Sequence, residues 1–234
     1  YYNLIVSSTS GTLGGNVTTT NDLTVNTGKT LALSTYNANV SSSLANSGTV
    51  TQTSGTVTIT GTGGTVGASG GSTILYNLTI DGALVTLGEN VTTTNNLTVN
   101  SGKTLDLATF NANVSSSLTN TGGALTQTSG TVTMSGTGNL GGGTTNISAL
   151  IVSGATTLAG NVTASSTVNI SGTLSGAGKT LTLTGTGTPL TISGTFNANT
   201  STVAYWGSTA IIATGTYYNL IVSSTSGTLG GNVT

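Results

Sequence analysis

Residues 18–44 read TTTNDLTVNTGKTLALSTYNANVSSSL, and residues 92–118 repeat this stretch in all but a few positions as TTTNNLTVNSGKTLDLATFNANVSSSL. Its shortest unit is a triplet such as Leu23-Thr24-Val25, in which two aliphatic side chains flank a small or polar one. Successive side chains of a β-strand point to opposite faces, so the two outer residues share a face. The pattern predicts short strands with one dry and one wet face, closed by turns rich in Gly, Asn and Ser.

The sequence repeats on two length scales. Residues 1–18 return letter for letter as residues 217–234, which gives a period of 216 residues. Three degenerate copies of unequal length fill this period, at 1–74, 75–146 and 147–216, and 217–234 starts the next period. Repeats of this size indicate solenoids, in which each unit buries its apolar face against its neighbours. We expect one continuous solenoid that is a window of a longer repetitive polymer.

Composition selects the kind of solenoid. Charged residues make up 3% of the chain, proline occurs once, and no helical periodicity is present, so helical repeats are excluded. The predicted fold is all-β, a parallel β-helix with about 18–20 residues per coil and roughly 12–13 coils. Parallel crossover connections favour a right-handed coil. At about 4.8 Å per coil and about twelve coils, one period would rise roughly 58 Å.

The residues needed for common chemistries are missing or scattered. The chain has no histidine and no cysteine, which removes the usual general base, thiolate chemistry and the commonest metal ligands. The segment GAGKT at 176–180 is not a phosphate-binding loop, because Thr173 stands where the first glycine is required. We expect no enzyme activity, no catalytic, metal or cofactor site, and no nucleic-acid surface from three lysines. The acids are dispersed and not repeated between copies: Asp22, Asp81, Glu89 and Asp106.

Low charge also bears on solution behaviour. With so few groups that titrate between acid and alkaline pH, we expect stability to be nearly independent of pH over that range. A chain with seven charges in 234 residues and exposed strand edges is expected to associate with itself. No stretch approaches eighteen continuous apolar residues, so no membrane span is predicted within this sequence.

Two sets of repeated residues are candidate contact sites. Asparagines at one repeat position could stack as a side-chain amide ladder at a corner, or could simply tolerate a left-handed turn; they are Asn16, Asn90, Asn161 and Asn232. Isoleucines in the middle of the NLIV-type strands should point outward along one wall, where they could contact a neighbouring filament or be there by chance; they are Ile5, Ile151 and Ile221.

The segments SSLANSGTVTQTSGTVTITG at 42–61 and SLTNTGGALTQTSGTVTMSG at 117–136 contain Asn-x-Gly turns and Gly-Thr-Val-Thr strands. In these features the chain resembles the repetitive β-helical stalks of bacterial surface proteins, including filamentous-haemagglutinin-like adhesins and autotransporter passenger domains. The resemblance implies a solenoid fold and an extracellular or cell-surface location, and it transfers no catalytic or binding residue. Near absence of charge and the verbatim repeat distinguish this chain from many such stalks.

Three functions are compatible with these features. The first is a structural protein of an extracellular filament, whose partner is itself. The second is the stalk of an adhesin, for which a carbohydrate or a cell surface would be the partner of a tip domain. The third is ice binding, suggested by outward threonines in segments such as 56–60 and 180–184.

Overall fold

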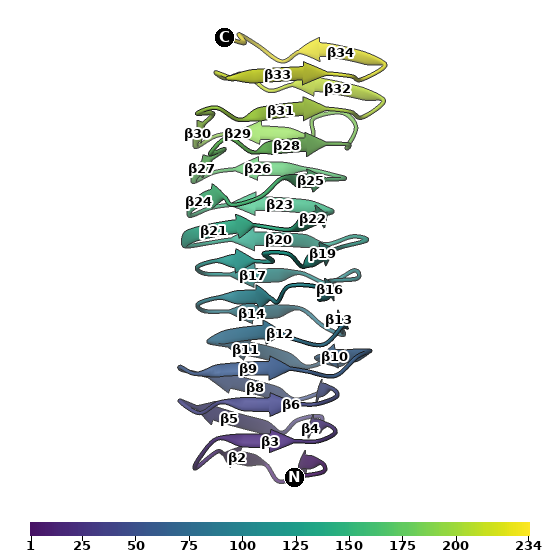
Figure 1. The fold of residues 1–234 in the computed structure, drawn as a ribbon, viewed down its shortest axis with the longest axis vertical. Coiled ribbons are helices and arrows are strands. Elements are labelled where there is room, and N and C mark those ends of the chain that lie inside the picture. The colour runs from purple at the N-terminus through teal and green to yellow at the C-terminus, as the bar shows by residue number, and fades with distance from the viewer.

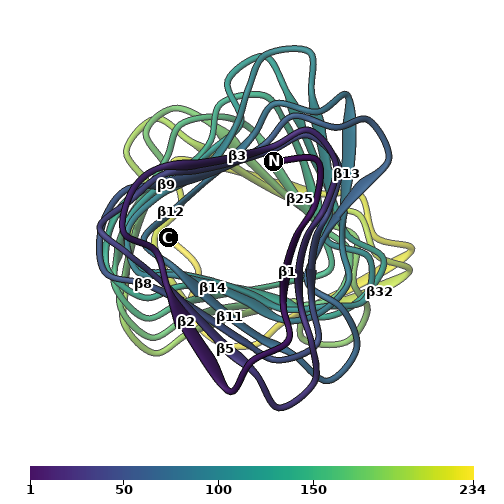
Figure 2. The same ribbon diagram turned by 90° about the horizontal axis from the view of Figure 1, so that it is seen from below.

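Three short strands per turn wind into a triangular coil in the computed structural model, which describes residues 1–234 (Figures 1 and 2). The chain forms 34 strands of two to five residues and no helix. In Figure 2 the chain runs clockwise as it recedes from the N-terminal end, and in Figure 1 the front strands rise to the right. The coil is therefore right-handed, and the prediction of a parallel β-helix is confirmed.

Each side of the triangle is a parallel sheet whose strands come from successive turns. Sheet A contains, in spatial order, β1 (Leu4–Val6), β4 (Leu23–Val25), β7 (Leu44–Asn46), β10 (Gly64–Val66), β13 (Leu84–Leu87), β16 (Thr104–Asp106), β19 (Ala124–Thr126), β22 (Thr144–Ile147), β25 (Val162–Ala164), β28 (Thr180–Leu183), β31 (Thr202–Tyr205) and β33 (Asn219–Val222). Sheet B contains β2 (Ser10–Thr12), β5 (Thr30–Ser34), β8 (Thr49–Gln52), β11 (Ser72–Leu75), β14 (Val91–Thr93), β17 (Ala112–Val114), β20 (Thr131–Met134), β23 (Ala149–Val152), β26 (Val168–Ile170) and β29 (Leu190–Ile192).

Sheet C contains β3 (Val17–Thr19), β6 (Ala38–Val40), β9 (Thr56–Ile59), β12 (Asn77–Ile80), β15 (Leu97–Val99), β18 (Leu118–Thr119), β21 (Thr137–Gly141), β24 (Ala155–Leu158), β27 (Thr173–Ser175) and β30 (Thr195–Asn197). A fourth sheet at the C-terminal end pairs β32 (Thr209–Ile212) with β34 (Ser226–Leu229). No strand of sheet C follows β30, and the chain between β32 and β33 crosses that side as a loop.

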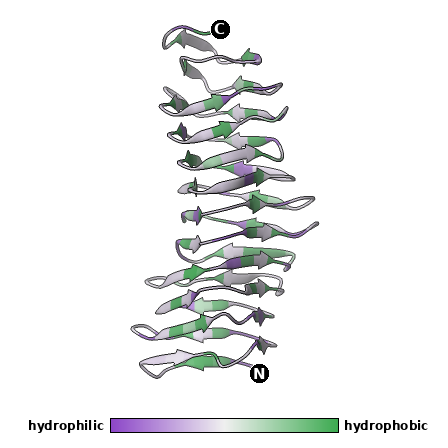
Figure 3. Cartoon of the chain, turned by 90° about the vertical axis from the view of Figure 1, so that its left-hand side faces the viewer, coloured by the Kyte–Doolittle hydropathy of each residue, from purple (hydrophilic) through white to green (hydrophobic).

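The core fills the inside of the coil along its whole length. In β4, Leu23 and Val25 are fully buried while Thr24 between them faces outward, as the triplet pattern predicts. Parallel pairing stacks Leu4 on Leu23 and Leu23 on Leu44, so like side chains lie above one another. Together 47 buried residues form one hydrophobic cluster, and Figure 3 shows hydrophobic residues on the strands from end to end. Burial of each aliphatic side chain contributes about 1.5–3 kcal/mol.

The solenoid makes about 11 turns rather than the predicted 12–13. Sheet A has 12 strands from β1 to β33, so 11 steps separate the two identical segments. Turns are longer than expected: 19 residues separate Leu4 from Leu23, and 21 separate Leu23 from Leu44. The predicted rise of 58 Å per period therefore becomes about 53 Å at about 4.8 Å per turn.

A single sequence copy does not contain a whole number of turns. The strand that opens each copy lies on a different sheet, because Leu4 is in β1 of sheet A, Leu78 in β12 of sheet C and Leu150 in β23 of sheet B. Eleven strand positions make three and two-thirds turns, so each copy is rotated by one side of the triangle. Three copies restore the starting sheet, and Leu220 in β33 returns to sheet A.

Candidate functional site

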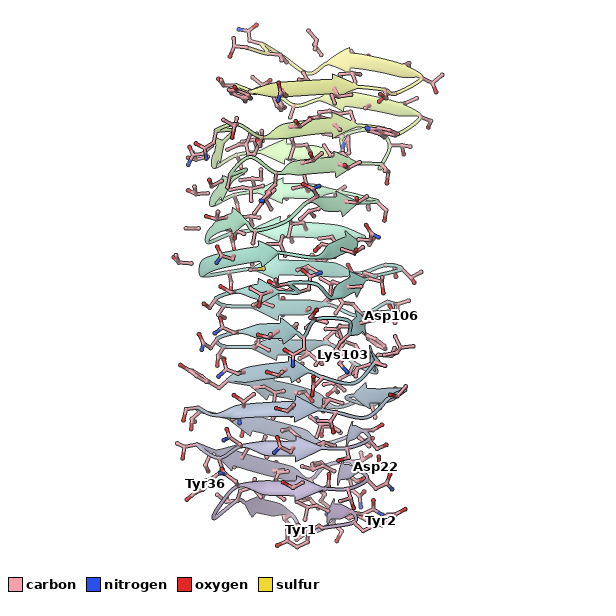
Figure 4. All side chains as sticks on the ribbon, viewed as in Figure 1. Tyr1, Tyr2, Asp22, Tyr36, Lys103 and Asp106 are labelled. Atoms are coloured by element: carbon pink, nitrogen blue, oxygen red, sulfur yellow. The ribbon has the colours of Figure 1, made fainter.

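The acidic side chains are held apart and take part in bonds within the wall. Asp22 Oδ1 accepts a backbone N–H of the next turn at 3.0 Å, and Asp81 Oδ1 accepts Asn100 Nδ2 at 3.0 Å. Asp106 Oδ1 accepts its own turn's N–H at Ala108, 2.9 Å away. Figure 4 shows Asp22 and Asp106 at different heights of the solenoid. No three acidic side chains gather into a group able to hold a metal ion.

The three isoleucines do not form one row. Ile5 and Ile221 lie on sheet A at opposite ends of the solenoid, whereas Ile151 lies on sheet B. Ile5 is 58% exposed and Ile221 45% exposed, while Ile151 is only half-buried. The expectation of a shared wall is wrong because a copy rotates by one side of the triangle. Outward contact by each isoleucine separately stays a prediction.

The four repeat-equivalent asparagines do not stack on one another either. Asn16 precedes β3 of sheet C, Asn90 precedes β14 of sheet B, and Asn161 precedes β25 of sheet A. Asn232 lies near the C-terminal end, more than ten turns from Asn16. None of the four has a positive φ, so the left-handed turn is not their role. Their shared feature is different: each lies directly before an inward-facing valine.

Side-chain ladders do form, between other residues of successive turns. Asn16 Oδ1 accepts the N–H of Asn37 at 2.9 Å, and Asn37 Oδ1 accepts the N–H of Thr56 at 2.8 Å. The same pattern recurs one side further round, where Asn90 accepts from Asn111 and Asn111 from Thr131, both at 2.8 Å. Each acceptor precedes the first inward residue of a strand. Further rungs of this kind join Asn3 to Asp22, Asp22 to Ser43, Ser43 to Thr65, Asn77 to Asn96, Asn96 to Ser117, Ser117 to Asn139, and Asn161 to Thr180.

One corner contains a buried carboxyl group. Glu89 is 4% exposed and reaches under the glycine-rich loop 67–71 that follows β10. Thr73 Oγ1 donates to Glu89 Oε1, and Asn46 Nδ2 donates to the same oxygen at 3.2 Å. Glu89 Oε2 is buried without a hydrogen-bond partner. Burial raises the pKa of Glu89 above its ordinary value, and the bonds from Thr73 and Asn46 offset part of that rise.

Register creates the space for this carboxyl group. Val66 at the end of β10 pairs with Leu44 at the start of β7, so Asn46 lies beyond the end of β10. Ala68 donates its N–H to the Asn46 carbonyl at 2.9 Å, which holds the loop over the corner. The side chain of Asn46 then points inward and accepts the N–H of Gly48 at 3.0 Å.

A second corner, around Asn120, repeats this arrangement without the acid. Asn120 Nδ2 donates to Thr145 Oγ1 at 3.1 Å, as Asn46 Nδ2 donates to Thr73 Oγ1 at 2.9 Å. Gly160 stands at the repeat position of Glu89, and an open hollow remains there. Glycines and one lysine make up much of its lining, namely Gly122, Gly123, Gly142, Gly143, Gly160 and Lys179.

The two identical terminal segments, 1–18 and 217–234, have opposite surroundings. Figure 4 shows Tyr1 and Tyr2 at the N-terminal end, where Tyr1 is 77% exposed. Its counterpart Tyr217 is 9% exposed, because the preceding turn lies against it. Val6 is buried under the following turn, whereas its counterpart Val222 is 45% exposed.

An aromatic cluster fixes the C-terminal segment on the turn beneath it. Tyr217 Oη donates to the Ala213 carbonyl at 2.8 Å and lies 3.3 Å from Tyr205 Oη. The Phe196 and Tyr217 ring centroids are 6.2 Å apart. Burial raises the pKa of Tyr205 and of Tyr217, the latter also because the two phenols bond to each other. The repeat alignment missed this cluster, although the identity of the two segments marks Tyr217 as the partner of Tyr1.

No protein family, curated protein or solved structure matches this chain. No membrane-crossing helix is found among its elements. The fold defines the class of protein, a right-handed three-sided β-solenoid built from a long sequence period.

Proposed function

We propose that the chain is a structural segment of a long extracellular filament whose wall is a continuous β-solenoid. The observation that carries the proposal is the whole-number relation between sequence and structure. One 216-residue period makes 11 turns, and the next period begins on the same sheet, with β33 paired in parallel on β31. Further periods can be added without changing which side of the coil each residue faces.

The wall suits a durable, chemically quiet fibre. Inside, aliphatic side chains are stacked on one another and removed from water. At the corners, side-chain ladders add hydrogen bonds from each turn to the next beyond those of the sheets. The predicted likeness to bacterial surface stalks and the extracellular location belong to this proposal and rest on the sequence patterns at 42–61 and 117–136.

Electron microscopy of lengthened chains tests the proposal. Chains with one, two and three periods, each followed by residues 217–234, should form straight rods whose length increases by about 53 Å per period, with a spacing of about 4.8 Å along the axis. Rods that do not lengthen in this ratio would contradict a continuous filament. Images of the native molecule separate the alternative, since discrete rods ending in a globular head would indicate an adhesin stalk.

Ice binding is a second candidate, favoured by one observation. Sheet C presents an outward row in which five of six successive turns have threonine. The row contains Thr18, Asn39, Thr58, Thr79, Thr98 and Thr119. Thermal hysteresis of the purified chain, abolished by Thr79→Tyr and unchanged by a matched Thr86→Tyr on sheet A, would support it. Absence of hysteresis at micromolar concentration would remove it.

A further inference from the structure

The identical segments 1–18 and 217–234 show two halves of one environment. In the N-terminal copy the following turn is in place and the lower edge is free. In the C-terminal copy the preceding turn is in place and the upper edge is free. The exposures of Tyr1 and Tyr217, 77% and 9%, measure what the preceding turn adds. The C-terminal copy therefore displays how an N-terminal segment lies on residues 201–216.

That seat is a specific surface. β33 lies on β31 with Thr202 opposite Asn219 and Val203 opposite Leu220. β34 lies on β32 with four further pairs, from Thr209 opposite Ser226 to Ile212 opposite Leu229. Tyr217 adds the aromatic and hydrogen-bonded contacts with Phe196, Tyr205 and Ala213.

We propose that residues 1–18 of a second copy of this chain can replace residues 217–234 on this seat, joining the two copies head to tail by segment exchange. The inference rests on the proposed function, because it extends the same solenoid axis between separate chains. Since the two segments have the same sequence, every contact with residues 201–216 is reproduced. The incoming segment is also already covered by its own following turn, so both of its edges become paired.

Exchange has a defined balance of gains and costs. The contacts that residues 217–234 lose are regained by the incoming segment, and the free strand edges of both chains disappear at the junction. The displaced 18 residues recover conformational freedom, which offsets part of the entropy lost when two chains associate. Exchange of identical elements is a known low-cost route to association.

Engineered cysteine pairs can report the junction, because the chain has no cysteine of its own. Asn219 Nδ2 contacts Thr202 Oγ1 at 3.4 Å, and Asn3 is the counterpart of Asn219. The full chain carrying Asn3→Cys and Thr202→Cys has these positions at opposite ends, so a disulfide between them must join two chains. Neighbouring parallel strands are about 4.8 Å apart, within the range that a disulfide spans.

The expected result is a ladder of disulfide-linked dimers and longer rods under mild oxidation. A matched pair, Asn3→Cys with Thr180→Cys, places the second cysteine one turn lower in the same column and should give at most a tenth of the product. Asn219→Cys with Thr202→Cys should close within one chain and verifies the local geometry. If Asn3→Cys with Asn219→Cys gives the dimers instead, turns stack without exchange and the proposal is overturned.

Two identical substitutions must act in opposite directions. In the Asn3→Cys, Thr202→Cys chain, Tyr217→Ala weakens the resident segment and should raise the yield of linked chains about tenfold. Tyr1→Ala weakens the incoming segment and should lower it about tenfold, since loss of a buried aromatic contact and a hydrogen bond is worth about this factor. Equal effects of the two variants would refute exchange. Covalently lengthened rods would still form in that case, so failure here is distinct from failure of the proposed filament.

Discussion

The corner around Asn46 and the corner around Asn120 contain the same buried Asn–Thr pair, but the next turn contributes a carboxyl group to one and nothing to the other. Both asparagines are fully buried, and both accept a backbone N–H from a glycine, Gly48 in one and Gly143 in the other. The pair is therefore the constant part of the corner, which closes the turn through its hydrogen bonds.

The variable part is the loop above the pair. In the first corner this loop contains Ala68 and Ser69 between its glycines, and in the second the corresponding stretch, 141–143, is three glycines without those two residues. The longer loop covers the Glu89 side chain, whereas the shorter one leaves the open hollow at Gly160. The comparison indicates that the solenoid tolerates an isolated acid inside its wall only where the turn beside it supplies donors and cover.

Removal of the asparagines should have the largest effect and should separate the corners. We expect Asn46→Ala to lower the free energy of unfolding by about 3 kcal/mol and Asn120→Ala by about 2 kcal/mol, because both leave buried partners unsatisfied. Asn46 additionally donates to Glu89. Denaturant titration at pH 7 measures the two values, and the difference should vanish when both variants also carry Glu89→Gly. Equal losses in the parent chain would show that the bond to Glu89 contributes nothing.

Gly67 should be the next most sensitive position. Its φ of +85° lies in the left-handed region, and an added Cβ would meet the Glu89 side chain. We expect Gly67→Ala to cost about 2 kcal/mol in the parent chain, from backbone strain and the displaced carboxyl group. With Glu89→Gly only the strain remains, so the cost should fall to about 1 kcal/mol. An unchanged cost in that background would mean that Glu89 is free to move aside.

Glu89 should also make stability depend on pH. Because its pKa is raised in the folded chain, the folded state retains a proton that the unfolded state releases above about pH 4.5. Its effect on stability is absent below that pH and becomes destabilising as the pH rises toward the folded-state pKa. Glu89→Gln should therefore raise the melting temperature at pH 7 and leave it nearly unchanged at pH 4. If the variant and the parent differ equally at both pH values, ionisation of Glu89 is not the cause.

This dependence revises the expectation of a nearly flat pH profile, and its origin could have been found in the sequence. The repeat position of Glu89 is glycine in the other copies, at Gly15, Gly160 and Gly231. A single acid at a glycine position of a turn is a departure from the repeat. The sequence alone does not show that it is buried, because burial depends on a register shift between β7 and β10.

The local fold followed from the sequence, but the stacking of distant residues did not. Triplets such as Leu23-Thr24-Val25 fixed the inward and outward faces through the two-residue period of a strand. Which residues lie above one another depends on the number of residues per turn, which the irregular corners alter. A copy of three and two-thirds turns therefore sent Ile5 and Ile151 to different sheets. Asn16 found its ladder partner in Asn37, not in Asn90.

The smallest effect is expected from placing an acid in the corner that lacks one. Gly160→Glu gives the second corner the side chain of the first, next to Thr145 and Asn120, which already bond to each other. The loop 141–143 is too short to cover the new carboxyl group, so it should remain in water near Lys179. We expect a change within about 0.5 kcal/mol and no new pH dependence, measured by denaturant titration at pH 4 and pH 7. Insertion of Ala-Ser between Gly141 and Gly142 in the same variant should bury the carboxyl group and create the pH dependence of the first corner. If Gly160→Glu alone produced that dependence, loop length would not be what distinguishes the two corners.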